Sequence, residues 1–126
     1  MHVLLIEPDR ILARTYAQAL SEAGCTVRHA VSAQQAVHEA DQQTPDVVLL
    51  ELQLPQHNGV EFLYEFRSYS EWLKVPVVVH SMVPPQELES AATLQKELGV
   101  ADVLYKPETS LRRLCQAVQK LASITP

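Results

Sequence analysis

The sequence predicts an α/β protein in which helices cover both faces of a parallel β-sheet. Five short apolar runs alternate with five segments of helical periodicity, and this alternation is typical of repeated β-α units. The run Val-Val-Leu-Leu at 47–50 contains no polar residue, as expected for a central strand that is buried on both faces. We therefore predict one domain, residues 1–126, with a doubly wound sheet of five parallel strands and five flanking helices.

The amino-terminal elements are bounded by residues that favour helix ends. Asp9 and Ser32 are expected to cap the first two helices, because a short polar side chain accepts a hydrogen bond from the first helical turn. Gly24 is the expected stop of the first helix. The predicted strands of this half cover 3–6 and 25–30, and the second is polar enough for a sheet edge.

The carboxy-terminal half continues the same alternation. After the strand at 47–50, Pro55, Asn58 and Gly59 indicate a loop. The elements predicted after it are a helix from Val60 to near Trp72, a strand over 75–81, a helix from Pro84 to Leu98, a strand over 100–105 and a last helix with Leu111, Leu114, Val118 and Leu121 on one face.

Composition and charge argue against several classes of protein. The formal net charge of −5 gives no electrostatic gain from binding nucleic acid or an anionic membrane, so neither is an expected partner. No apolar run reaches the roughly 20 residues of a membrane helix, and the first residues lack the basic region of a signal peptide, so we expect a cytoplasmic protein. Cys25 and Cys115 have no metal-binding spacing, and free thiols are favoured over a disulfide.

Polar residues follow four of the predicted strands. Glu7 and Asp9 come after the first, and Glu51, Ser81 and Lys106 close the third, fourth and fifth. Right-handed crossovers place the carboxyl ends of parallel strands on one edge of the sheet, where open α/β sheets bind their ligands. These carboxylates, the hydroxyl and the ammonium are therefore expected to converge in one cleft.

The sequence resembles the receiver domains of bacterial two-component signalling, the response-regulator fold, from Val3 to Leu121. The most specific parts of the resemblance are the segments 46–59 (Asp-Val-Val-Leu-Leu-Glu-Leu-Gln-Leu-Pro-Gln-His-Asn-Gly), 76–81 (Pro-Val-Val-Val-His-Ser) and 102–107 (Asp-Val-Leu-Tyr-Lys-Pro). The resemblance implies a flavodoxin-like sheet in the order 2-1-3-4-5. It also implies a cis peptide before the proline of the last segment.

In this family, an aspartate at the end of the third strand accepts a phosphoryl group from a histidine kinase, with magnesium beside it. Ser81 and Lys106 match the family's phosphoryl-binding residues, and Glu7 matches the first acid of its metal-binding pair. Glu51 stands at the place of the acceptor aspartate, and Pro8 at the place of the second acid. In-line phosphoryl transfer is sensitive to displacements of about 1 Å, so the longer side chain of glutamate predicts a poor acceptor.

The resemblance therefore predicts a degenerate, or pseudo-, receiver that is not an enzyme and needs no cofactor. We expect Glu51 to pair with Lys106 and to mimic the phosphorylated state. One alternative is a functional phosphorelay receiver that accepts a phosphoryl group at Glu51 or another residue with Mg²⁺; the other is a solvated Glu51 without a role. Weak relic candidates for metal ligands are Glu7, Asp9, Glu51 and Gln53. Asp9 is expected to be a helix cap rather than a metal ligand. Glu7 is expected to be either a relic ligand or a solvated loop acid. Ser81 is expected to bond either local backbone groups or an anion.

Signalling would then take place through contact with another signalling protein, such as a histidine kinase, an output domain or a regulator. The resemblance implies a partner surface on the fourth helix, fifth strand and fifth helix, which could also form a homodimer. Exposed candidates there are Glu87, Gln95, Arg112, Arg113 and Lys120. Val103 replaces the family's usual aromatic switch, and the long segment from Ser81 to Gly99 suggests a displaced fourth helix. The chain is expected to be either a stand-alone receiver or a fragment of a larger protein.

Overall fold

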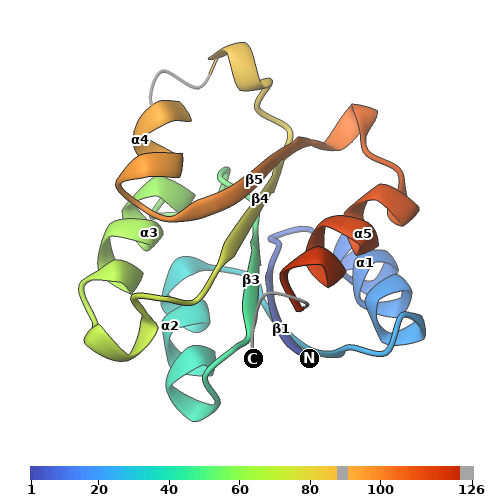
Figure 1. Ribbon diagram of the computed structural model, residues 1–126, viewed down its shortest axis with the longest axis horizontal. Coiled ribbons are helices and arrows are strands. Elements are labelled where there is room, and N and C mark those ends of the chain that lie inside the picture. The colour runs from blue at the N-terminus through green and yellow to red at the C-terminus, as the bar shows by residue number, and fades with distance from the viewer. Residues whose placement is uncertain (88–90, 123–126) are drawn as a thin grey trace.

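Five parallel strands form one sheet in the order β2-β1-β3-β4-β5, as predicted (Figure 1). The computed structural model describes residues 1–87 and 91–122. The strands are β1 (His2–Ile6), β2 (Thr26–Ala30), β3 (Val47–Leu50), β4 (Val77–Ser81) and β5 (Val100–Tyr105). β3 lies at the centre of the sheet, so the cleft at its carboxyl end has β1 on one side and β4 on the other.

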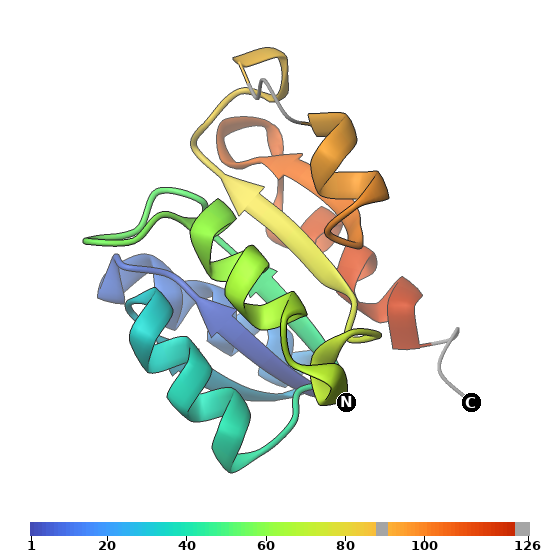
Figure 2. The ribbon, with the colours of Figure 1, turned by 90° about the vertical axis from the view of Figure 1, so that its left-hand side faces the viewer.

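Helices cover both faces of the sheet. The helices are α1 (Arg10–Glu22), α2 (Ala33–Gln42), α3 (Gly59–Arg67), α4 (Ala91–Lys96) and α5 (Leu111–Ala122). In Figure 1, α1 and α5 lie together on one face, and α2, α3 and α4 lie on the other. Figure 2 shows α2 and α3 side by side. In the part of the chain that the structure describes, no helix has the length and hydropathy required to span a membrane.

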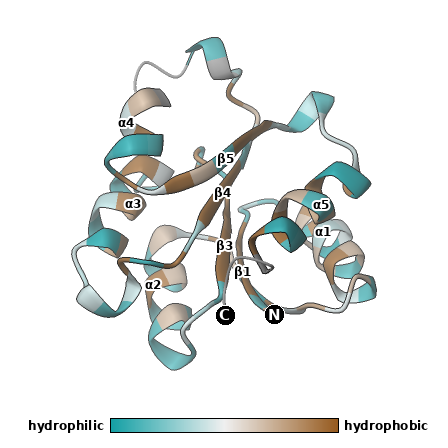
Figure 3. Ribbon diagram, in the orientation of Figure 1, coloured by the Kyte–Doolittle hydropathy of each residue, from teal (hydrophilic) through white to brown (hydrophobic). Residues whose placement is uncertain are grey.

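The strands divide the core into two apolar layers, because successive side chains of a strand point to opposite faces. Val48 and Leu50 pack into the layer under α2, α3 and α4, whereas Val47 and Leu49 pack into the layer under α1 and α5. All four residues of β3 are buried, as their unbroken apolar run predicts. The central strands accordingly form the most hydrophobic part of the ribbon in Figure 3.

Polar side chains cap the amino-terminal ends of α1, α2 and α3. The Asp9 carboxylate accepts hydrogen bonds from the amides of Ile11 and Leu12, at 2.9 and 3.0 Å, and Ser32 caps α2 in the same way. Both predicted caps are confirmed. Asn58, which the sequence indicated only as a loop residue, caps α3 through Glu61 N at 2.9 Å.

Two predicted helices are shorter than their sequence patterns. α3 ends at Arg67 and a separate 3₁₀ helix, η1 (Ser70–Trp72), follows. At this end both the amide and the hydroxyl of Ser68 donate to the carbonyl of Glu65, as serine commonly does where a helix stops. The helix predicted from Pro84 to Leu98 includes a 3₁₀ turn, η2 (Pro85–Glu87), and α4; residues 88–90 lie outside the described part.

The prediction of a cis Lys106–Pro107 peptide is wrong, because this bond is trans. Lys106–Glu108 forms a 3₁₀ helix, η3, in which Pro107 occupies the first turn. That position suits the fixed φ of proline and requires no amide donor. The trans isomer, which X-Pro bonds favour by about 0.5–1 kcal/mol, therefore fits the chain here.

The side chain of Arg67 ties three segments together on the α3 side of the sheet. Its Nε donates to the carbonyl of Leu98 at 2.8 Å and its Nη1 to that of Trp72 at 2.7 Å. Nη2 donates to the carbonyl of Gly99 at 3.3 Å, immediately before β5. One guanidinium thus supplies backbone hydrogen bonds that regular secondary structure does not provide at these positions.

Candidate functional site

The carboxyl ends of β1, β3, β4 and β5 bring Glu7, Glu51, Ser81 and Lys106 into one buried cluster, which we call the cleft cluster. The topology places all four strand ends on one edge of the sheet, and the side chains are long enough to meet there. Four of the polar residues expected to converge are thus linked in the chain Ser81–Glu51–Lys106–Glu7, while the fifth, Asp9, caps α1.

Lys106 lies between the two carboxylates of the cleft cluster. Its Nζ is 2.7 Å from Glu51 Oε1 and also donates to Glu7 Oε1. The exposed fractions of the three side chains are only 6% for Lys106, 4% for Glu51 and 3% for Glu7. Burial alone would lower the pKa of Lys106, but its bonds to Glu51 and Glu7 outweigh burial and raise it. The ammonium therefore remains charged at neutral pH.

Both carboxylate oxygens of Glu51 are engaged. Oε2 accepts from Ser81 Oγ at 2.5 Å and from the amide of Gln53 at 3.0 Å. Oε1 accepts from Lys106 and from the amide of Met82 at 3.2 Å. Burial by itself would raise the pKa of Glu51, yet the hydrogen bonds from Lys106, Ser81 and the Gln53 amide lower it below its usual value. Glu51 is thus an ionised carboxylate held by four donors.

The β1–α1 loop supplies Glu7 but no second carboxylate directed at Lys106. The remaining oxygen of Glu7, Oε2, accepts from the amide of Asp9 at 3.1 Å. Pro8 has no carboxylate, and Asp9 turns its side chain to the first turn of α1. Of the four relic metal candidates, the structure joins Glu7 and Glu51 through Lys106. Gln53 contacts the cluster through its backbone amide.

Two aromatic side chains lie beside the cleft cluster on the α1 side. Lys106 Nζ is 5.9 Å from the centroid of the Tyr16 ring, and that ring meets His80 edge to face at a centroid distance of 4.9 Å. Burial lowers the pKa of His80 to about 4, so its imidazole is neutral at pH 7. The sequence analysis did not identify Tyr16 as a neighbour of Lys106, because a buried aromatic residue in a helix is usually explained by core packing.

The five residues predicted for the partner surface are all exposed. Gln95 lies on α4 and Arg112, Arg113 and Lys120 lie on α5, whereas Glu87 lies in η2, before α4. Arg113 Nη2 is 3.1 Å from Asp102 Oδ2, which links α5 to β5 at the surface. Val103 is partly buried and packs against the apolar layer under α2, α3 and α4. The position of the usual aromatic switch therefore holds a small side chain.

Residues 3–119 match the response regulator receiver domain family. Curated relatives include the KDP operon transcriptional regulatory protein KdpE of Escherichia coli K12, 34% identical over 106 residues that make up 84% of this chain and 44% of KdpE. The alginate biosynthesis transcriptional regulatory protein AlgB of Pseudomonas syringae pv. tomato is 32% identical over 83% of this chain and 22% of AlgB. The chain thus spans less than half the length of these relatives.

Solved structures share the fold at lower sequence identity. A sensor protein from Polaromonas sp. JS666 superposes with a TM-score of 0.87 over 99% of this chain and 98% of that chain, at 22% identity. Chemotaxis protein CheY4 of Vibrio cholerae has a TM-score of 0.84 over 95% of this chain and 97% of its own, at 21% identity. These likenesses concern the fold, whereas the sequence match over 3–119 establishes the family.

Proposed function

The chain belongs to the response regulator receiver domain family, and we propose that it is a pseudo-receiver, which signals by protein contact without phosphorylation of an aspartate. The observation that carries the proposal is the position of Lys106, bound to both Glu51 and Glu7 in a buried cluster. The cation and the hydroxyl that would bind a phosphoryl group already hold a carboxylate of the protein itself.

Glu51 is poorly arranged to accept a phosphoryl group. A nucleophilic carboxylate oxygen needs an open line of approach, but each oxygen of Glu51 accepts two hydrogen bonds. Attack would require the loss of contacts to Ser81 or Lys106, and each hydrogen bond to a charged group contributes about 1.5–3 kcal/mol. The same contacts also fix the reacting atoms in a geometry set by the longer side chain, and transfer tolerates errors of only about 1 Å.

The residues present do not fit a magnesium ion. Mg²⁺ requires oxygen ligands in a near-octahedral array, and the carboxylates of Glu7 and Glu51 instead share the ammonium of Lys106. A divalent cation there would lie beside another positive charge. Asp9 would have to give up its cap on α1 to replace the carboxylate that Pro8 lacks. We therefore propose that the protein acts without a metal.

The pairing of Glu51 with Lys106 supports a single fixed state that resembles the phosphorylated one. An anion at the end of β3 already reaches both Lys106 and Ser81, as a phosphoryl group on an aspartate would. We propose that the surface of α4, β5 and α5 presents this state to a histidine kinase, an output domain, another regulator or a second copy of the chain. Arg112 and Arg113 are exposed there for such contacts.

Intact mass after incubation with acetyl phosphate and magnesium tests the proposal. We expect no phosphoryl adduct on the wild type, because Glu51 is engaged and one metal-binding acid is missing. Glu51→Asp combined with Pro8→Asp restores both residues and should acquire an adduct, which also shows that the fold can support transfer. The single variant Glu51→Asp separates the effect of side-chain length from that of the metal.

An adduct on the wild type would instead support a working phosphorelay receiver, the second candidate. This second candidate is favoured by one observation: Ser81 and Lys106, which match the family's phosphoryl-binding residues, are both present and both contact Glu51. Fragmentation of the adduct would then show whether Glu51 or another side chain carries the phosphoryl group. Loss of the adduct in Glu51→Gln would assign it to Glu51.

A further inference from the structure

Two separate structural requirements place an asparagine–glycine pair at the start of α3. Asn58 caps the helix, because its Oδ1 accepts from the amide of Glu61 at 2.9 Å. Gly59 is buried against the chain that follows β3, where an added Cβ would lie 2.7 Å from Leu52 Cα. Asn58 is also the only asparagine in the sequence. The protein therefore contains one Asn–Gly bond, at a position that capping and packing determine.

An asparagine followed by glycine is open to an intramolecular reaction. The amide nitrogen of Gly59, once it has lost its proton, can attack Asn58 Cγ; the new C–N bond closes a succinimide ring, and the side-chain nitrogen leaves as ammonia. Water then opens the ring at either carbonyl, which gives aspartate or isoaspartate at position 58. Glycine favours the attack because it has no Cβ beside the nitrogen. Asn58 is exposed, so burial does not keep water away from it.

Both reacting groups are engaged elsewhere in the fold. The amide of Gly59 donates to the carbonyl of Leu52 at 2.8 Å, which holds its proton and directs the nitrogen toward the end of β3. The side chain of Asn58 reaches forward to the amide of Glu61 instead of folding back over the Gly59 nitrogen. The backbone of Asn58 is extended, with ψ 169°. Ring closure therefore requires both hydrogen bonds to break together.

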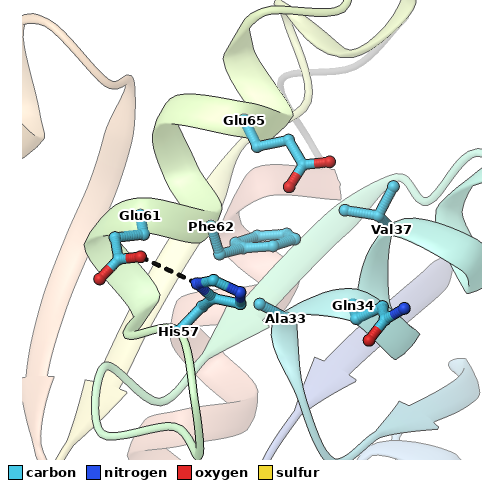
Figure 4. A pocket seen from close by; sticks show the side chains of 7 residues that line it. All are labelled: Ala33, Gln34, Val37, His57, Glu61, Phe62 and Glu65. Atoms are coloured by element: carbon cyan, nitrogen blue, oxygen red, sulfur yellow. Dashed lines mark hydrogen bonds and ion pairs between the residues drawn. The ribbon is translucent and has the colours of Figure 1, made fainter.

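A side-chain contact also spans the pair. Figure 4 shows His57, the residue before Asn58, joined to the carboxylate of Glu61, and the two atoms, Nδ1 and Oε2, are 3.0 Å apart. Both side chains are more than half exposed, at 65% and 56%, so this contact contributes little. The backbone amide of Glu61, rather than its side chain, is the group that restrains Asn58.

We propose that Asn58–Gly59 is a latent deamidation site, held unreactive by the hydrogen bonds to Glu61 and Leu52 and released when the start of α3 opens. A lost cap and a lost backbone hydrogen bond together correspond to a folded protein that reacts about 10- to 100-fold more slowly than the unfolded chain. The proposal concerns neither Lys106 nor phosphorylation, so it is independent of the proposed pseudo-receiver role.

The two products have different consequences for the fold. Aspartate at position 58 keeps an oxygen that can cap α3. Isoaspartate adds one carbon to the backbone directly before Gly59. This glycine has no room to move, since its missing Cβ would already lie 3.0 Å from the carbonyl oxygen of Glu51. Isoaspartate should therefore displace the start of α3 beside the cleft cluster, whereas aspartate should leave it in place.

Intact mass spectrometry of the whole chain follows the reaction, because deamidation adds one dalton and Asn58 is the only asparagine. The protein is incubated at pH 8, folded in buffer and unfolded in guanidinium chloride, and peptide mapping assigns the change to Asn58 and separates the two products. We expect the unfolded chain to react about 10- to 100-fold faster. A phosphoryl adduct has a far larger mass, so the two proposals fail or succeed separately.

Two variants at one position isolate the effect of the cap. Glu61→Pro removes the amide that donates to Asn58 Oδ1, and proline is tolerated in the first turn of a helix. Glu61→Ala removes the same side chain, with its contact to His57, but keeps the amide. Folded Glu61→Pro should deamidate about fivefold faster than folded Glu61→Ala, the effect of one lost cap. Circular dichroism verifies that both variants are folded, and the wild-type comparison stands without them.

Three results would overturn the proposal. Equal rates for the folded and unfolded wild type would mean that the fold gives Asn58 no protection. Equal rates in folded Glu61→Pro and Glu61→Ala would show that the amide of Glu61 does not restrain the reaction. Absence of deamidation at Asn58 in the unfolded chain would show that the pair is not reactive in this sequence.

Discussion

Glu51 and Lys106 form a buried ion pair in which Oε1 and Nζ are 2.7 Å apart and the two side chains are 4% and 6% exposed. The ends of β3 and β5 supply the partners, although β4 lies between these strands. A buried pair is weak evidence for net stabilisation, because desolvation offsets the attraction between the charges. Removal of one partner has a much larger effect, since it leaves the other charge buried and unpaired.

Lys106→Met should lower the free energy of unfolding at pH 7 by about 3–5 kcal/mol, because Glu7 and Glu51 would keep two buried charges without a cation. Urea denaturation followed by circular dichroism measures the change. Lys74→Met, at an exposed position, is the matched control. A loss below about 1 kcal/mol, typical of surface pairs, would contradict the buried role of Lys106.

Glu51→Gln should reduce the dependence of stability on pH in the acidic range. The pKa of Glu51 is lowered from 4.5 in the folded protein, so its contribution is fully present above pH 4.5 and is lost as pH falls through the folded pKa. In the variant this part of the acid destabilisation disappears. Urea denaturation at a series of pH values from 6 downward measures it, with the exposed Glu97→Gln as control. An unchanged acid slope in Glu51→Gln would be inconsistent with a stabilised carboxylate.

His80→Phe should remove a second, less acidic part of the pH dependence. Burial lowers the pKa of His80 from 6.5 to about 4, so the unfolded chain takes up a proton in this range before the folded protein does. Stability therefore falls as pH drops from 6.5 to about 4, by at most roughly 3 kcal/mol. Phenylalanine keeps an aromatic ring against Tyr16 without this proton.

The measurement for His80→Phe is the free energy of unfolding at pH 7, 5.5 and 4.5. His38→Phe serves as control, because His38 is exposed. Some slope should remain, since burial also lowers the pKa of His2. The same loss between pH 7 and 4.5 in the wild type and in His80→Phe would show that His80 is not held neutral by the fold.

Gly59→Ala should destabilise the protein more than Gly24→Ala, for a different reason. A Cβ at Gly59 would lie 2.7 Å from Leu52 Cα and 3.0 Å from the carbonyl oxygen of Glu51. The start of α3 would have to move to relieve this overpacking, which costs about 1–3 kcal/mol. Gly24 has φ +95° and open space around the missing Cβ, so alanine adds only backbone strain of about 1–2 kcal/mol. Thermal and urea denaturation of both variants compare the two effects, and a smaller loss for Gly59→Ala would refute this ranking.

The sheet and the place of the cleft could be predicted because both depend on local patterns. The buried run at 47–50 fixed the central strand, and polar residues at the strand ends indicated which side chains meet. The pairing of Glu51 with Lys106 followed from the same edge of the sheet. The second bond of Lys106, to Glu7, could not be predicted, because it depends on how a long side chain crosses from β5 past two intervening strands to β1.

Element boundaries and loop conformations were less accessible from the sequence. The trans bond before Pro107 reflects the 3₁₀ turn that the chain adopts after β5, which the order of residue types does not specify. At the early end of α3 the amide and hydroxyl of Ser68 both donate to the carbonyl of Glu65, a local arrangement that the apolar periodicity does not encode. Arg67 carried no signal at all, since an arginine in a helix usually indicates a solvated face.

The hydrogen bonds of Arg67 have a consequence for local unfolding. Arg67, the last residue of α3, donates to the end of η1 and to the turn after α4. Neither segment can therefore open without breaking a hydrogen bond to Arg67. Segments coupled in this way behave as a single cooperative unit in hydrogen exchange. The amides around Trp72 and Val100 should therefore exchange with a common opening free energy, although about 28 residues of chain separate them.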